Sequence, residues 1–307
     1  MNRVTDKKIV LITQKTRLEQ LIFRYNTPGQ AEFYITHHGG DFSEYQQEHE
    51  NYQNALKTVV SFLEGYARLQ ILDKDYLSNY LFSDNDIVIA LGRDGLVVNV
   101  MKYLTSQRLI GVNPDPIRYD GVLLPFSPDD LSKILPELQK RPVKSVTLAS
   151  AILNDGQKLY AVNDLFIGQK THASARYEIH LDGRREMQSS SGVIVSTGLG
   201  STGWLKGILA GASGIDNYYG ISRKLTIPDD FNASSGYLYF TVREPFPSKA
   251  TGTDIVFGKI RNNMRIISQM PENGVIFSDG MEHDYLEFNS GASVKIQVAD
   301  KTGNLVI

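Results

Sequence analysis

The segment Gly92-Arg93-Asp94-Gly95 places an acid and an arginine between two glycines, directly after the apolar run 87–91. In an open α/β sheet, ligands bind beyond the carboxyl ends of the strands, where a glycine turn lets backbone N–H groups approach a phosphate. A carboxylate at that edge can act as a general base. An aspartate here can also cap the helix that follows near Leu96, so the pattern leaves both interpretations open.

A second glycine loop, 198–203, follows the strand-like segment 192–196 and precedes a helical pattern. Its glycines match G-x-G-x-x-G, the spacing of a dinucleotide fingerprint. A Rossmann fingerprint belongs at the first strand-to-helix turn, whereas this loop comes late in the chain, so we interpret it as a nucleotide-contacting loop. Ser201 and Thr202 supply hydroxyl groups. Trp204 supplies a surface on which a base can stack, although a tryptophan can equally anchor a core.

Other polar stretches are weaker candidates. Asn163 and Asp164 interrupt a strand pattern, which costs stability unless something binds them, although a β-bulge would also explain them. The pair Asp279-Gly280 is most simply a hairpin turn. The six histidines show no ligand spacing with carboxylates on a helix, which argues against a zinc enzyme. No Lys-Ser or Lys-Thr follows a correctly spaced glycine, which excludes a P-loop NTPase.

The elements that must position these residues divide the chain in two, since 307 residues exceed the size at which one core usually keeps growing. Over residues 1–127, apolar runs alternate with helical patterns, which predicts a Rossmann-like, doubly wound α/β domain. Over residues 128–307, short segments rich in β-branched and aromatic residues predict a β-rich domain. The strands expected in the first domain are 9–13, 31–36, 87–91 and 109–113, and the helical patterns are 52–66 and 96–104.

Composition narrows the class of partner. Apolar residues make up 41% of the chain, and no apolar stretch is long enough to cross a bilayer, so no membrane partner is expected. The chain has no cysteine, which excludes disulfides and thiolate chemistry. The net charge is −2 with scattered Lys and Arg, unlike the basic footprint of a nucleic-acid binder. We therefore expect a small-molecule partner, and a cytoplasmic location because no secretory signal is visible.

Taken in order, these loops resemble the motifs of the NAD kinase family, closest to its mitochondrial-type branch. The resemblance covers most of the chain and implies a C-terminal β-sandwich whose last residues can return to the N-terminal domain. It also implies a homodimer or higher homo-oligomer. The matching stretches are 92–95, 111–116, 163–164, 189–192, 196–204, 242–245 and 278–280.

The resemblance implies transfer of the γ-phosphoryl group of ATP, or of polyphosphate, to the 2′-hydroxyl of the adenosine ribose of NAD, giving NADP. Mg²⁺ would be carried by the substrate phosphates, with no metal ligand from the protein. Asp94 would accept the hydroxyl proton, and Gly92, Arg93 and Gly95 would contact the phosphates of ATP. The residues that would bind NAD are Asn113, Asn163, Asp164, Thr197, Ser201, Thr202 and Trp204, the last in place of the family's usual tyrosine.

Two further residues depart from the family pattern. Arg93 stands where the family has a second glycine, and because arginine tolerates a positive φ poorly, the turn is expected to differ in shape or to be strained. Its guanidinium could also reach a triphosphate as a forked donor. Leu96 stands where a threonine is common. Two alternatives therefore stay open: a related kinase of the G-G-D-G group acting on a lipid or sugar, and a catalytically weak nucleotide-binding sensor.

Overall fold

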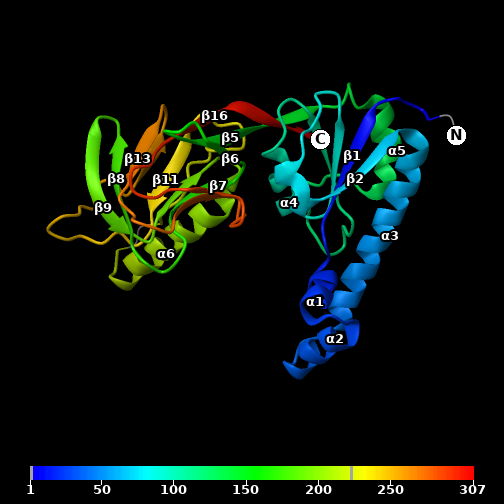
Figure 1. Cartoon of the computed structure of the whole chain (residues 1–307), viewed down its shortest axis with the longest axis horizontal. Coiled ribbons are helices and arrows are strands. Elements are labelled where there is room, and N and C mark those ends of the chain that lie inside the picture. The colour runs from blue at the N-terminus through cyan, green and yellow to red at the C-terminus, as the bar shows by residue number, and fades with distance from the viewer. Residues whose placement is uncertain (1–2, 222–223) are drawn as a thin grey trace. The chain divides into compact units, whose positions relative to one another are not determined.

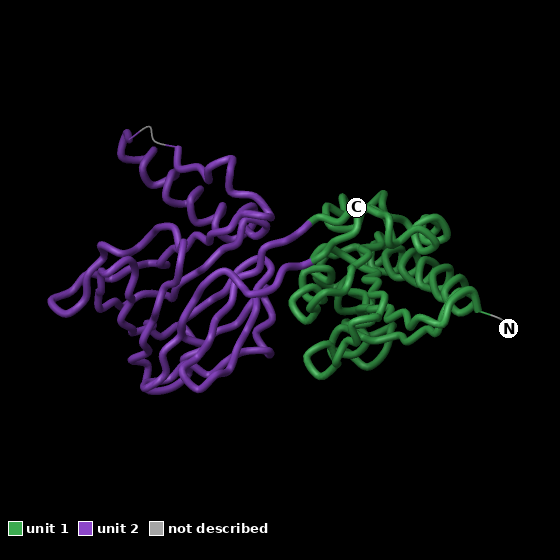
Figure 2. Tube along the Cα trace, turned by 90° about the horizontal axis from the view of Figure 1, so that it is seen from above, with its two compact units in different colours: residues 1–144, 304–307 green, residues 145–303 purple. Residues whose placement is uncertain are grey.

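The computed structural model describes residues 3–221 and 224–307. The chain forms two compact units, one of residues 1–144 and 304–307 and the other of residues 145–303 (Figure 2). The division lies later than residue 127 because the segment that follows still packs into the core of the first unit, through Leu131, Ile134 and Leu135. No helix in the described ranges is both long enough and apolar enough to span a membrane.

The first unit is an α/β domain built on parallel strands in the order β2-β1-β3-β4. The step from β1 to β2 and the step from β3 to β4 run in opposite directions across this sheet. Because such crossovers are right-handed, α3 and α4 lie on opposite faces, as Figure 1 shows. The doubly wound fold is confirmed. Its strands are β1 (Lys8–Thr13), β2 (Arg68–Asp73), β3 (Ile87–Leu91) and β4 (Arg108–Val112), and its helices are α1 (Arg17–Tyr25), α2 (Pro28–His37), α3 (Ser43–Tyr66), α4 (Asp94–Met101) and α5 (Leu131–Ile134), with short 3₁₀ turns η1 (Lys74–Asn79), η2 (Pro128–Asp130) and η3 (Leu135–Glu137).

The long helix α3 supplies much of the core of the first unit. Its residues Tyr52, Val59 and Leu63 recur at helical spacing and pack against Ile9 and Ile89 of the central strands. These side chains are less than a tenth exposed, and burying each one stabilises the fold by about 1.5–3 kcal/mol. The apolar face of this helix therefore fixes it to the sheet.

The strand expected over residues 31–36 is wrong, because these residues lie in helix α2. Thr27 caps this helix, and its hydroxyl accepts a hydrogen bond from the Gln30 backbone N–H at 3.2 Å. Pro28 is the first helical residue, where its fixed φ favours a helix and its missing N–H costs nothing. The start signal thus outweighs the β propensity of the aromatic and β-branched residues that follow.

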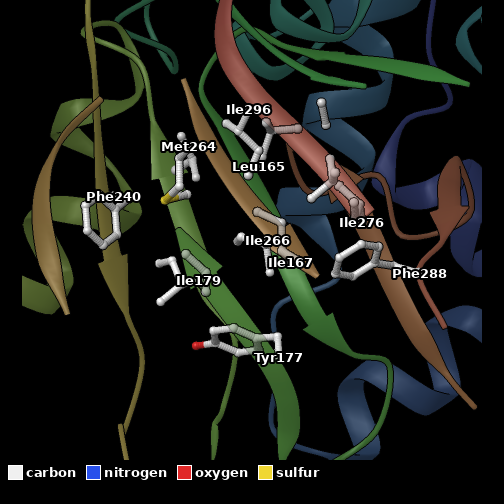
Figure 3. Packing of buried hydrophobic residues seen from close by; sticks show 14 of the residues in the cluster. Leu165, Ile167, Tyr177, Ile179, Phe240, Met264, Ile266, Ile276, Phe288 and Ile296 are labelled. Atoms are coloured by element: carbon white, nitrogen blue, oxygen red, sulfur yellow. The ribbon is translucent and has the colours of Figure 1, made fainter. Parts of the chain in front are cut away.

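The second unit is a β-sandwich with α6 (Trp204–Tyr218) on one outer face. One sheet has the strand order β12-β11-β10-β7-β14-β15, and β5, β6, β8, β9, β13 and most of β16 form the facing layer. Figure 3 shows Ile167 and Phe240 of the first sheet pointing toward Ile179 and Ile266 of the second. The strands are β5 (Val143–Leu153), β6 (Lys158–Ala161), β7 (Asp164–Gln169), β8 (Ala175–Leu181), β9 (Arg184–Ser190), β10 (Val193–Ser196), β11 (Leu238–Val242), β12 (Phe257–Ile260), β13 (Met264–Ser268), β14 (Gly274–Ser278), β15 (Tyr285–Glu287) and β16 (Ser293–Val306), and η4 (Gly200–Thr202) precedes α6.

Candidate functional site

The turn 92–95 lies at the carboxyl end of β3, beside the end of β1. The chain leaves these two neighbouring strands in opposite directions, which makes this edge the switch point where ligands bind in open α/β sheets. A Cβ on Gly92 would come within 2.8 Å of Leu96 Cδ2 and 3.0 Å of Gln14 Nε2, so glycine lets the turn close against its neighbours. Around Gly95, by contrast, a Cβ would meet open space.

Asp94 is the first residue of α4 and is half-buried. Its Oδ1 accepts a hydrogen bond from the Leu123 backbone N–H at 2.7 Å, so a loop outside the helix fixes the carboxylate. No other hydrogen bond to this carboxylate joins the described residues. Arg93, not Asp94, occupies the capping position, which removes the simple capping explanation and leaves an oriented acid at the switch point.

Arg93 has an extended backbone, with φ −109° and ψ 169°, so the turn differs in shape from a left-handed one and is not strained at this residue. Its Nη2 donates to Glu48 Oε1 at 2.5 Å, and its guanidinium carbon lies 4.9 Å from the centre of the Tyr119 ring. Two side chains from other elements therefore hold the guanidinium in place.

Asn113 follows β4 and is buried. Its Nδ2 donates to the Tyr119 carbonyl at 2.9 Å, and its Oδ1 accepts from the Asp115 N–H at 3.0 Å. Both ends of the amide are thus engaged inside the first unit, where they shape the loop that carries Tyr119.

In the second unit, the structure brings the loop at Asn163 against the loop that begins at Thr197. The Thr197 N–H donates to the Asn163 carbonyl at 2.9 Å, and its hydroxyl donates to the Val162 carbonyl at 2.6 Å. A Cβ on Gly200 would come within 2.1 Å of the Asn163 carbonyl oxygen. Thr197 is fully buried, so it acts by joining the two loops.

Asp279 is the residue that the sequence analysis missed, since a hairpin turn was the expected role. Its carboxylate accepts hydrogen bonds from the consecutive N–H groups of Val162, Asn163 and Asp164, the shortest being 2.7 Å. Such a row of N–H groups forms an anion-binding nest. Burial, together with the charge of Asp279, raises the pKa of Asp164 to about 7. The matching stretch 278–280 could have identified Asp279 as a candidate, because a hairpin turn alone does not require an aspartate.

The structure separates Ser201 and Thr202 from Trp204. The two hydroxyl residues line a cavity of about 780 Å³ between α6 and the segment 224–231. Trp204 lines a different cavity of about 360 Å³, where its ring stacks on Phe166 with 6.0 Å between ring centroids. Trp204 is therefore partly packed on the sheet and partly open to a ligand.

No group of three or more His, Asp or Glu residues that could hold a metal ion occurs in the described ranges.

Known proteins that are similar to this chain are NAD and NADH kinases. No family model matches the chain. A curated protein, the NAD kinase of Zymomonas mobilis, is 26% identical over 132 residues, which are 41% of this chain and 50% of that protein. The match thus spans about half the length of the relative.

Solved structures match over nearly the whole chain. An NAD kinase from Archaeoglobus fulgidus in complex with ATP has a TM-score of 0.57 at 14% identity and covers 98% of this chain and 93% of its own. Yeast NADH kinase complexed with NADH has a TM-score of 0.56 at 14% identity, with 98% and 84% covered. The resemblance read from the motifs is therefore confirmed, and the chain has the fold of the NAD kinases.

Proposed function

We propose that the protein is an NAD kinase, which transfers the γ-phosphoryl group of ATP to the 2′-hydroxyl of the adenosine ribose of NAD and releases ADP and NADP. The observation that carries this proposal is the Asp94 carboxylate, oriented by Leu123 at the switch point of an NAD kinase fold. The similar proteins are named for this activity, and one of their structures holds ATP. Polyphosphate is a second candidate donor with the same reacting group.

Asp94 is the proposed general base. In a phosphoryl transfer, the bond from the ribose oxygen to phosphorus forms as the bond to the leaving phosphate breaks. An alcohol holds its proton until late in such a reaction, so the carboxylate first orients the hydroxyl and then accepts its proton. Gly95 in the first turn of α4 would present its backbone N–H group to the phosphates, and Arg93 would add a cation. Gly92 would shape the turn beside the phosphates, since its own N–H donates to the Val112 carbonyl at 3.2 Å.

Residues of the second unit would bind NAD. Asn163 and Asp164 would hold the ribose and adenine, and an acid with a pKa of about 7 can donate as well as accept a hydrogen bond near neutral pH. Trp204 would stack on the base. Ser201 and Thr202 line the other cavity, where the Thr202 hydroxyl would contact another part of the dinucleotide and the Ser201 hydroxyl already donates to the Gly198 carbonyl at 2.7 Å. Asn113 and Thr197 would act by shaping the loops around these contacts, because their side chains are already engaged.

Mg²⁺ belongs to the proposal as an ion carried by the nucleotide. It prefers oxygen ligands and is usually bound through substrate phosphates with one or two carboxylates. The phosphate oxygens of ATP supply such ligands, so no side chain of the protein is assigned to the ion. When bound, the ion would neutralise charge on the transferring phosphoryl group.

The test mixes purified protein with Mg²⁺, ATP and NAD and measures NADP with a dehydrogenase specific for NADP. We expect Mg²⁺-dependent NADP formation, and we expect Asp94→Asn to lower turnover by about 10²- to 10⁴-fold while NAD binding persists. Near wild-type turnover in this variant would remove Asp94 from the mechanism. NAD binding without product, with polyphosphate and NADH also tested, would favour a nucleotide sensor, and no binding would favour a lipid or sugar kinase.

We also propose a cytoplasmic homodimer or higher homo-oligomer. Exposed apolar side chains at the end of α6 support an assembly, since Ile215, Tyr218 and Tyr219 are each more than half exposed. Sedimentation of the purified protein tests this statement, and a monomer at micromolar concentration would contradict it.

A further inference from the structure

Glu48 is a buried acid that the proposed mechanism does not use. It lies on α3, is only 6% exposed, and bonds through both carboxylate oxygens to arginines from other elements. Arg93 of the turn donates to Oε1 at 2.5 Å, and Arg17 of α1 donates to Oε2. Burial opposes ionisation, but the hydrogen bond from Arg17 and the charge of Arg93 hold the pKa of Glu48 below its usual value.

Arg93 occupies an unfavourable place for a cation. It is the capping residue of α4, and the positive end of the helix dipole repels a positive charge there. A free arginine side chain also samples many rotamers, and ordering it costs up to about 2 kcal/mol. Glu48 and the Tyr119 ring offset both effects by holding the guanidinium in one position. The structure therefore maintains a cation where local electrostatics disfavour one.

The arrangement also leaves N–H donors of Arg93 available to a ligand. The Glu48 carboxylate is shared between two guanidinium groups, and Arg17 pairs in addition with Glu44 at 4.0 Å. A guanidinium has five N–H donors, and the described residues engage one of those of Arg93 as a hydrogen bond to Glu48. The Arg93 side chain is 42% exposed, so an anion can reach it.

We propose that Glu48 is a positioning residue that holds Arg93 ready to bind the phosphate chain of the phosphoryl donor beside Asp94. This inference rests on the proposed function and deepens it, because it assigns donor binding to a pair formed by α3 and the turn. A phosphate chain at this place would complement both the guanidinium and the N-terminus of α4.

The first experiment measures binding by calorimetry, with Mg²⁺·ATP and with inorganic tripolyphosphate as probes. Wild type, Glu48→Gln, Arg93→Gly and the double variant are compared. We expect Arg93→Gly and Glu48→Gln each to weaken binding of both probes about ten-fold or more, since hydrogen bonds to charged groups are lost or misplaced. We expect Glu48→Gln to add little to Arg93→Gly, because it acts through that residue.

Glu44→Gln is the matched control. Glu44 lies one turn earlier on α3 and also pairs with arginines, at 3.4 Å from Arg118 and 4.0 Å from Arg17, but it does not contact Arg93. This variant should bind both probes like wild type. If Glu48→Gln does not fold, as thermal unfolding will show, Glu48→Asp replaces it, because a shorter acid keeps the charge but loses reach.

Kinetics separate positioning from a structural role. Glu48→Gln should raise the KM for ATP far more than it lowers kcat, and the KM for NAD should stay within about two-fold. Equal weakening by Glu48→Gln with and without Arg93 would overturn the inference, as would unchanged binding in Arg93→Gly. Binding changes in a protein that makes no NADP would reject the proposed activity and retain the Arg93 site. NADP formation with unchanged probe binding in the variants would support the proposed activity and reject the Arg93 site.

Discussion

Asp164 and Asp279 are two acids placed close together in the second unit. The backbone N–H groups at 162–164 stabilise the negative charge of Asp279. Repulsion between the two carboxylates therefore opposes the ionisation of Asp164, which is largely buried. The pKa of Asp164 rises from 3.8 to about 7, so the folded protein holds this proton more tightly than the unfolded chain. Linkage then requires that stability falls as the pH rises between these two values.

We predict that Asp164→Asn stabilises the fold at pH 8 and leaves it unchanged near pH 4. Asparagine cannot ionise, so it removes a penalty of at most about 4 kcal/mol that is present in full only above both pKa values. Thermal unfolding at the two pH values measures the difference. Asp155→Asn is the opposite control, because hydrogen bonds from Gln157 lower the pKa of Asp155. A variant less stable than wild type at pH 8 would contradict the prediction.

At this scale, the sequence indicates the position of Asp94 better than the contacts that hold the candidate site residues. Asp94 could be predicted because a strand, a glycine turn and a helix follow one another in the chain. Glu48 and Asp279 could not, because their partners lie far away in sequence. Glu48 reaches Arg93 across 45 positions, and Asp279 reaches Asn163 across 116. Such contacts exist only once the fold is formed.

The loop at Asn163 and the loop that begins at Thr197 are packed together in the second unit, because the 3₁₀ turn η4 lies directly on the loop at Asn163. We predict that Gly200→Ala destabilises this unit by about 1–3 kcal/mol and lowers NAD affinity. A Cβ at Gly200 would lie 2.1 Å from the Asn163 carbonyl oxygen, so the two loops must move apart. Calorimetric NAD titration and thermal unfolding measure the two effects.

Gly207→Ala supplies the comparison for this substitution. Gly207 lies within α6, and a Cβ there would meet nothing within 4 Å. Alanine favours a helix over glycine by about 1 kcal/mol, so this variant should be slightly more stable than wild type and should bind NAD unchanged. Equal loss of NAD affinity in both variants would show that the close contact at Gly200 is not the cause.

At the scale of elements, the error at α2 shows where sequence patterns are ambiguous. The segment 31–36 has the composition of a short strand, and only the preceding Thr27 and Pro28 indicate a helix. The helix is nearly as apolar on one side as on the other, so periodicity gives little help. By contrast, the sequence predicts a helix in the region of α3, because its buried residues recur at helical spacing over many turns.

The chain passes between the two units twice, once after residue 144 and once after residue 303 (Figure 2). Strand β16 pairs with β13 in the second unit and, through Asn304 and Leu305, with β4 in the first. The sequence predicts an α/β part followed by a β part, because the hydrophobic periodicity changes from helical spacing to short strands between them. The extent of the first unit depends instead on which core Leu131 and Ile134 join, which no local pattern determines.

This crossing predicts that a residue near the end of β16 stabilises the first unit. Val306 is fully buried and belongs to the same core as Ile9 and Leu63, although residues 145–303 before it form the second unit. We predict that Val306→Ala destabilises the first unit by about 2 kcal/mol. Hydrogen exchange should become faster in β3, while exchange in β10 stays as in wild type.

Ile307→Ala makes the same kind of truncation one residue later. Ile307 is 48% exposed, so this variant should exchange like wild type in both units. Faster exchange in β10 as well as β3 after Val306→Ala would mean that the two units unfold as one cooperative block, since loss of one core would then open the other. Protection lost only from β3 would mean that the first unit opens independently, and with it the turn that carries Asp94.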